Sequence, residues 1–98
     1  MKPRLNQHQI ITIKQLALGL FGSRDVWVFG SRADESLKGG DIDIYLETEQ
    51  QNQLLQSKFA FLREFDKACG EQKVDLLINS HQEQQDIFDI AKTQGVKL

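Results

Sequence analysis

Two aspartates two residues apart, Asp41 and Asp43, begin an apolar run that is typical of a β-strand over residues 41–47. Residues two apart on a strand project from the same face, with their Cα atoms about 7 Å apart, so both carboxylates can reach one divalent cation. The opposite face of the strand points into a core and carries the apolar residues Ile42, Ile44 and Leu46. Mg²⁺ takes hard oxygen ligands and often binds one or two carboxylates together with substrate phosphates. The pair therefore predicts a Mg²⁺ site.

A third acid, Asp75, interrupts another apolar segment, residues 73–78. Its apolar neighbours share one face of a strand, which leaves Asp75 on the other face. If this strand lies beside residues 41–47 with matching faces, three carboxylates surround one spot. Such a cluster is repulsive unless cations occupy it. The three acids therefore predict a metal site, with Asp41, Asp43 and Asp75 as its ligands.

A Gly-Ser pair, Gly30 and Ser31, ends the apolar segment that precedes the Asp-x-Asp pair. Glycine has no Cβ, so a ligand can approach the backbone, and the serine offers a hydroxyl. The amides of a following helical turn would be unpaired donors, which suits a phosphate. Arg32 could clamp a triphosphate oxygen or could be a solvated charge, and the sequence does not decide between the two. Gly30, Ser31 and Arg32 are therefore the candidate nucleotide-binding residues.

The order of these motifs carries a resemblance. A Gly-Ser pair, a nine-residue gap over residues 32–40, Asp-x-Asp and a later Val-Asp-Leu strand resemble the nucleotidyltransferase superfamily of DNA polymerase beta. The short chain resembles the minimal nucleotidyltransferase (MNT) domains in particular. The resemblance extends from Val26 to Ile78, and the closing residues 94–98 are similar to an ending common in that family.

The resemblance implies a nucleotidyltransferase fold and a Mg²⁺-dependent transfer of AMP from ATP. Two divalent ions would clamp the attacking and leaving oxygens of an in-line displacement. Asp41 and Asp43 would hold both ions, and Asp75 would ligate the ion nearest the acceptor and help to remove its proton. Gly30 and Ser31 would hold the terminal phosphates of the nucleotide.

The resemblance also implies a partner. Minimal members of the family resemble antitoxins that silence a HEPN-domain toxin, an RNase, by adenylylating a tyrosine. Two other readings stay open. The chain could be a non-catalytic antitoxin or subunit that inhibits its partner by binding alone, or it could modify a small molecule such as an aminoglycoside, with a partner chain completing the acceptor pocket.

Strands are predicted over residues 25–29, 41–47 and 73–78, with a short edge strand at the C-terminus. The chain between Asp43 and Asp75 is long enough for a crossover between parallel strands, which would place Asp75 level with the pair. Trp27 lies in the first apolar strand, where a core position is favoured over base stacking. The predicted fold class is α/β (α+β), with a small mixed sheet of three to four strands flanked by helices.

Apolar spacings of three and four residues predict the helices. They span residues 6–21 before a Gly22 cap, a long segment from after Gln53 to about Cys69, and residues 80–93 from a capping box at Ser80–Glu83. The polar segment 31–38 is expected to form a further short helix. The long helix should bury Leu55, Phe59, Leu62, Phe65 and Ala68 or Cys69, and the last helix Ile87, Phe88, Ile90 and Ala91. His8 and His81 are expected to be solvated residues of first helical turns.

Composition narrows the function classes. A chain of 98 residues with 40% hydrophobic and 27% charged residues suits one domain over residues 1–98. A net charge of −2 argues against an extensive nucleic-acid surface. No apolar run approaches the roughly 20 residues that span a bilayer, and the N-terminus lacks a secretory apolar segment, so a cytoplasmic protein is expected. The single Cys69 cannot form an internal disulfide.

Overall fold

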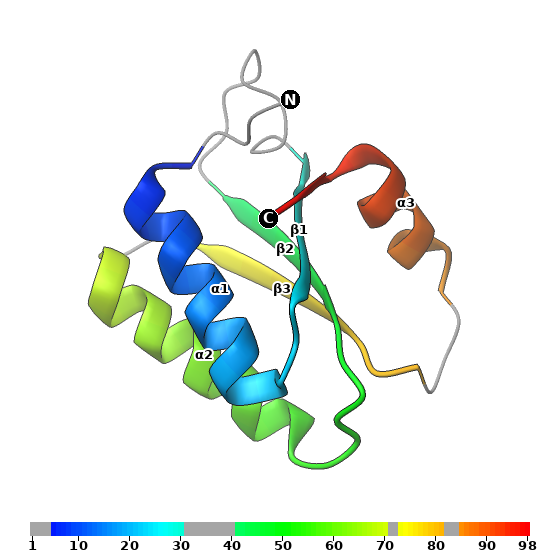
Figure 1. The fold of residues 1–98 in the computed structure, drawn as a ribbon, viewed down its shortest axis with the longest axis horizontal. Helices are drawn as coiled ribbons and strands as arrows, with labels where there is room; N and C mark the ends of the chain where they lie inside the picture. The colour runs from blue at the N-terminus through cyan, green and yellow to red at the C-terminus, as the bar shows by residue number, and fades with distance from the viewer. Residues whose placement is uncertain (1–4, 31–40, 71–72, 82–84) are drawn as a thin grey trace.

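The computed structural model describes residues 5–30, 41–70, 73–81 and 85–98. Within these residues, helices pack on both faces of a mixed sheet, so the predicted fold class is confirmed (Figure 1). The elements in chain order are α1 (Gln7–Phe21), β1 (Asp25–Phe29), β2 (Ile42–Glu47), α2 (Leu54–Cys69), β3 (Val74–Asn79), α3 (Asp86–Gln94) and β4 (Val96–Lys97). The three predicted strands and the C-terminal edge strand are therefore present, with ends within one residue of those expected.

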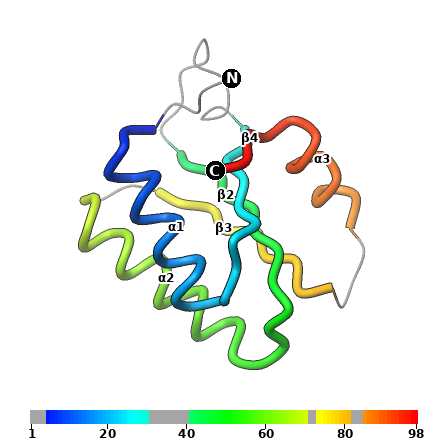
Figure 2. The backbone as a smooth tube through the Cα atoms, viewed as in Figure 1, coloured from blue at the N-terminus to red at the C-terminus, as the bar shows by residue number. Residues whose placement is uncertain are grey.

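The sheet has the order β3-β2-β1-β4. β1 pairs antiparallel with β2 and with β4, and Figure 2 shows β4 beside β1 at the C-terminus. β2 and β3 are parallel, as the crossover length suggested, and α2 makes the connection between them. The parallel register sets Asp43 directly beside Asp75, and Ile44 beside Leu76.

Each face of the sheet has its own apolar core. α1 and α2 cover one face, and their buried residues pack with the inward residues of β1, β2 and β3. α3 covers part of the other face, where Trp27, Tyr45, Phe88 and Ala91 form a smaller cluster. The Trp27 and Tyr45 rings have centroids 5.4 Å apart. Trp27 is thus a core residue, as predicted.

The first helix agrees with its prediction at both ends. Asn6 and Gln9 form a reciprocal capping box, in which the Asn6 side chain accepts from the Gln9 amide and the Gln9 side chain accepts from the Asn6 amide. Gly22 ends the helix in the left-handed conformation, with φ of +62°. His8 lies exposed on the first turn, where its Nε2 is 2.9 Å from the Ala68 carbonyl oxygen of α2.

The buried stripe of α2 differs from the predicted one. Leu55 and Phe59 are 61% and 59% exposed, while Phe61 and Phe65 are fully buried. The helix carries two neighbouring apolar stripes, and spacing alone does not show which one faces the sheet. Packing against α1 and the sheet buries Phe61, which was not predicted, together with Phe65, which was. Leu62 is half-buried against the same core, as predicted.

The last helix begins later than predicted. α3 starts at Asp86 after Gln85, so a helix beginning at Ser80 is wrong; Gln82 and Glu83 of the expected capping box lie outside the described residues. The Asn79 side chain instead accepts a hydrogen bond from the His81 amide, and His81 adopts a φ of +65°. Such local bonds compete with helix formation. His81 is exposed but is not in a helical turn.

Fewer residues of α3 are buried than the sequence predicted. Phe88 and Ala91 are buried, whereas Ile87 and Ile90 are exposed. Because α3 covers only part of its sheet face, a single apolar stripe of the helix makes the contact with the sheet. In the part of the chain that is described, no helix is long and apolar enough to cross a membrane.

A buried polar network under α3 supports one stability prediction. The fully buried Tyr45 hydroxyl donates to Glu47 Oε2 at 2.8 Å and accepts from Asn79 Nδ2 at 3.0 Å. Burial, as the main cause, raises the pKa of Tyr45 to about 12. The change Tyr45→Phe leaves the buried Asn79 amide without this acceptor and should lower the free energy of unfolding by about 1–3 kcal/mol. Urea unfolding measures the loss.

The matched control for this change is His8→Ala. It removes one exposed side-chain bond, to Ala68, and should alter the free energy of unfolding by no more than about 0.5 kcal/mol. Equal stability losses in the two variants would contradict the account of the Tyr45 network.

Candidate functional site

Two of the predicted site acids meet on neighbouring strands. Asp43 of β2 and Asp75 of β3 are register partners, and both project from the sheet face that carries α3. The pKa of Asp43 is raised above its usual 3.8, chiefly because burial disfavours its charge, and then because of the charge and hydrogen bond of Asp75 and the charge of Asp41. The parallel register thus places a pair of mutually repelling carboxylates at one spot, as the sequence predicted.

The third acid, Asp41, lies just before β2 and is paired differently. Its Oδ2 is 3.6 Å from the Lys73 ammonium, which precedes β3. Within the described ranges, no group of three or more His, Cys, Asp or Glu side chains is arranged to hold a metal ion. The structure therefore brings Asp43 and Asp75 together, while the Asp41 carboxylate contacts a cation at the same end of the sheet.

Gly30 lies against the acid pair. It follows β1 directly, and the residue before it, Phe29, is the register partner of Asp43. Gly30 has a φ of +67°, and a Cβ built on it would overlap the Asp43 carboxylate. Only glycine fits this position without moving Asp43. Ser31 and Arg32, the other candidate nucleotide-binding residues, lie outside the described residues.

These residues fit a hard divalent cation by their chemistry. The donors are carboxylate oxygens, which Mg²⁺ prefers, and burial together with the charges of Asp75 and Asp41 raises the pKa of Asp43. Because Gly30 has no Cβ, the Asp43 carboxylate lies directly against the backbone at the end of β1. Asp43 and Asp75 would therefore hold the cation, which would relieve the repulsion between their carboxylates.

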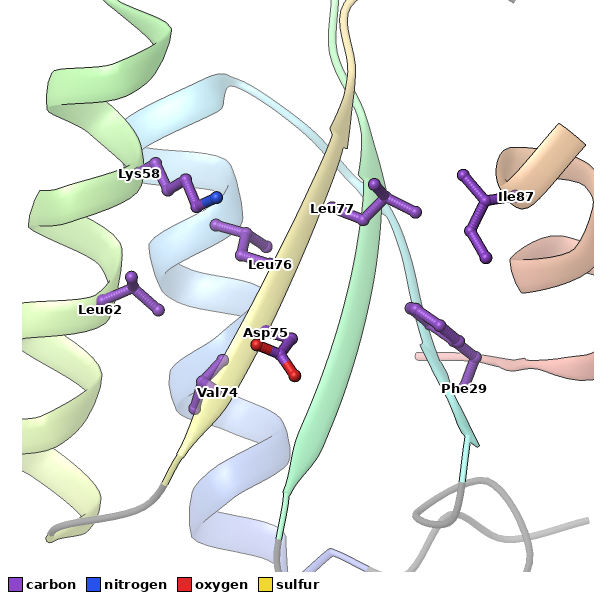
Figure 3. Close-up of a pocket in the computed structure, with 8 residues that line it drawn as sticks. All are labelled: Phe29, Lys58, Leu62, Val74, Asp75, Leu76, Leu77 and Ile87. Carbon is purple, nitrogen blue, oxygen red and sulfur yellow. The ribbon is translucent and has the colours of Figure 1, made fainter. Parts of the chain in front are cut away.

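A cavity of about 390 Å³ adjoins Asp75, and the sequence reasoning missed it (Figure 3). Phe29, Leu77 and Ile87 line it on the α3 side of β3, and Lys58, Leu62, Val74 and Leu76 line it on the α2 side. The only signal in the sequence was the apolar character of these residues, which was assigned to the core.

The acid pair predicts how stability responds to Mg²⁺ and pH. If Mg²⁺ binds only the folded chain, a concentration of about 100 times its Kd should stabilise the protein by about 2.7 kcal/mol, and the Asp43→Asn variant should lose most of this gain. Without divalent ions, Asp43→Asn should be more stable than the wild type at neutral pH, because the variant removes a half-buried charge that Asp75 and Asp41 repel.

The pH dependence follows from the direction of the shift. Since the pKa of Asp43 is higher in the folded than in the unfolded chain, the folded chain takes up this proton first as the pH falls. The wild type should therefore gain stability relative to Asp43→Asn as the pH is lowered from neutral toward 3.8. Thermal unfolding in a chelator across this pH range measures the difference, and a constant difference would contradict the prediction.

Comparisons with known proteins add to this geometry. A family model described as a nucleotidyltransferase domain matches residues 10–97. The comparison with curated proteins gives no match.

Three solved structures share the fold. A crystal structure from Shewanella oneidensis is 15% identical, with a TM-score of 0.69 over 96% of this chain and 71% of that chain. A mutant of the toxin-antitoxin complex MntA-HpeT is 20% identical, with a TM-score of 0.64 and the same coverages. A tri-AMPylated Shewanella oneidensis HEPN toxin in complex with an MNT antitoxin is 17% identical, with a TM-score of 0.58 over 91% of this chain and 70% of that chain.

Proposed function

Since the chain belongs to the nucleotidyltransferase domain family, we propose that it transfers AMP from ATP to a hydroxyl of a partner protein, with Mg²⁺ as the cofactor. The observation that carries the proposal is the parallel β2–β3 register, which sets Asp43 beside Asp75 on one face of the sheet. Gly30 joins this pair to the end of β1, where the nucleotide phosphates would bind. Two neighbouring carboxylates suit metal-assisted nucleotidyl transfer, which needs charge stabilisation and no covalent nucleophile.

In the proposed reaction each acid has a separate task. Asp41 and Asp43 would hold two Mg²⁺ ions, with Asp75 as a further ligand on the acceptor side. The bound ions would neutralise charge on the reacting phosphates. The acceptor oxygen forms a bond to the α-phosphorus, and the bond from that phosphorus to the β-phosphate oxygen breaks, so pyrophosphate leaves. Asp75, which is exposed, would take the hydroxyl proton and pass it to water.

We propose a HEPN-domain toxin as the partner and one of its tyrosines as the acceptor, so that the chain acts as an antitoxin in the cytoplasm. Support comes from a structural neighbour, whose HEPN toxin carries AMP groups while in complex with its MNT antitoxin. A second neighbour is also a toxin-antitoxin complex. The chain matches more than nine tenths of its own length in both comparisons.

A non-catalytic antitoxin is the second candidate. The observation in its favour is the pairing of Asp41 with Lys73, which accompanies the lack of a three-acid metal cluster among the residues the structure describes. In this case the chain would silence its partner by covering the RNase site, and the acids would have no catalytic task.

One experiment separates the two candidates. The chain is incubated with labelled ATP, Mg²⁺ and the HEPN protein that co-purifies with it. Label on the HEPN protein that disappears in the double variant Asp41→Asn with Asp43→Asn supports the transferase. Tight inhibition of the RNase without label supports binding alone. The control double variant, Asp66→Asn with Glu49→Gln, changes two exposed acids away from the site and should transfer label normally.

A further inference from the structure

β3 is the outermost strand of the sheet, next to β2 alone. No other strand in the described part of the chain pairs with its free side. Edge strands expose a row of backbone donors and acceptors that another extended chain can bind, and proteins commonly protect them with charges, proline or bulges. The residues of β3 are Val-Asp-Leu-Leu-Ile-Asn, which include one charge and no proline. The edge is therefore a ready template for a further strand.

The pairing with β2 shows which backbone groups are free. The carbonyl oxygens of Lys73 and Asn79 accept hydrogen bonds from the β2 side, from the amides of Ile42 and Thr48. The direction of these groups alternates along a strand, so those of the odd-numbered residues point to β2. The amides and carbonyls of residues 74, 76 and 78 consequently point outward from the sheet.

Apolar side chains border this edge on both sides. On the α2 side, Leu62 lines the cavity next to Lys58. On the α3 side, Ile87 is exposed and lines the cavity together with Leu77. Figure 3 shows Asp75 between these two flanks, at the strand itself. An extended chain bound here would have apolar contacts on both faces and one acidic group in the middle.

We propose that the open edge of β3 is the docking site for an extended segment of the acceptor protein, which adds to the sheet as a strand and presents its acceptor hydroxyl to Asp75. This inference rests on the proposed function. The occupant must be an extended backbone because only a backbone pairs with the row of amides and carbonyls at residues 74, 76 and 78. The occupant is the acceptor because the groove contains the acid assigned to the acceptor side.

The test compares two exposed apolar residues in complexes with the co-purifying HEPN protein. Ile87→Glu places a charge in the cavity beside the edge and should weaken binding at least about 30-fold, as loss of a central contact does. Leu18→Glu is the matched control. Leu18 is 46% exposed on α1 and lines a different pocket, with Arg24 and Leu98, so binding should change less than about twofold. Equal binding by both variants would overturn the proposal.

Hydrogen exchange on the wild-type chain tests the docking without any substitution. The amides of residues 74, 76 and 78 should exchange at least tenfold more slowly in the complex than in the free chain. Exchange at these amides that is unchanged by the HEPN protein overturns the proposal, as does a failure of the wild-type chain to bind that protein. Protection that grows with the concentration of the chain alone would identify a second copy as the occupant and would also overturn it.

The same measurements separate this proposal from the proposed function. Protected β3 amides in a complex that never transfers label would retain the docking site and refute the transferase. Label transfer with unprotected β3 amides and normal binding by Ile87→Glu would retain the transferase and refute the docking site.

Discussion

Replacing Asp43 by asparagine should reduce AMP transfer by roughly 10³-fold, because a metal ligand contributes several kcal/mol to stabilising the charge of the transition state. Asp43 is the central acid of the site, since its pKa is raised by burial and by both Asp75 and Asp41. An asparagine keeps the shape of the side chain and removes its charge. Single-turnover transfer of labelled AMP at saturating ATP and Mg²⁺ measures the loss.

The control for this variant is Asp66→Asn, an exposed acid of α2, which should retain full activity. The Asp43→Asn variant should lose activity while it gains stability in the absence of divalent ions, and this combination excludes misfolding as the cause. Transfer within tenfold of the wild type would remove Asp43 from the proposed machinery.

The second large loss of AMP transfer is expected when Gly30 is replaced by alanine. In Gly30→Ala the new methyl group would overlap the Asp43 carboxylate, which must move away. A displacement of about 1 Å in a catalytic group can cost about 100-fold in rate, so a loss of at least this size is expected. The backbone φ of +67° adds a stability cost of about 1–2 kcal/mol, since alanine disfavours the left-handed conformation.

Gly22→Ala is a matched control for Gly30→Ala. Gly22 has a similar φ of +62°, but a Cβ there meets nothing within 4 Å. The two variants should therefore lose comparable stability in thermal unfolding, while only Gly30→Ala loses AMP transfer. If both variants kept their activity, the contact between Gly30 and Asp43 would not contribute to AMP transfer.

The strands were predictable because their alternation is local. The alternation of residues 41–47 and the single acid in residues 73–78 were enough to predict that Asp43 and Asp75 share a face, and the register sets these two side by side. Asp41 precedes β2 and lies outside this register. The length of the connection between β2 and β3 allowed a parallel pairing but did not require it. The structure shows that the two strands are parallel.

The helices were harder because their orientation is decided by packing. Phe59 and Phe61 are both apolar and near each other, but only Phe61 contacts the core. The start of α3 depends on a local bond between Asn79 and His81 that apolar spacing does not reveal. The cavity beside Asp75 combines residues from β1, α2, β3 and α3, so no single sequence window contains it.

Asp43 and Asp75 lie on two strands that differ in their number of neighbouring strands. Among the described strands, β2 has a neighbour on each side, whereas β3 pairs with β2 alone. Terminal strands of a sheet open more readily than inner ones, well below the temperature at which the whole chain unfolds. Heating should therefore abolish catalysis before the core unfolds. A ligand that holds Asp43 and Asp75 together would also stabilise the pairing of β3 with β2.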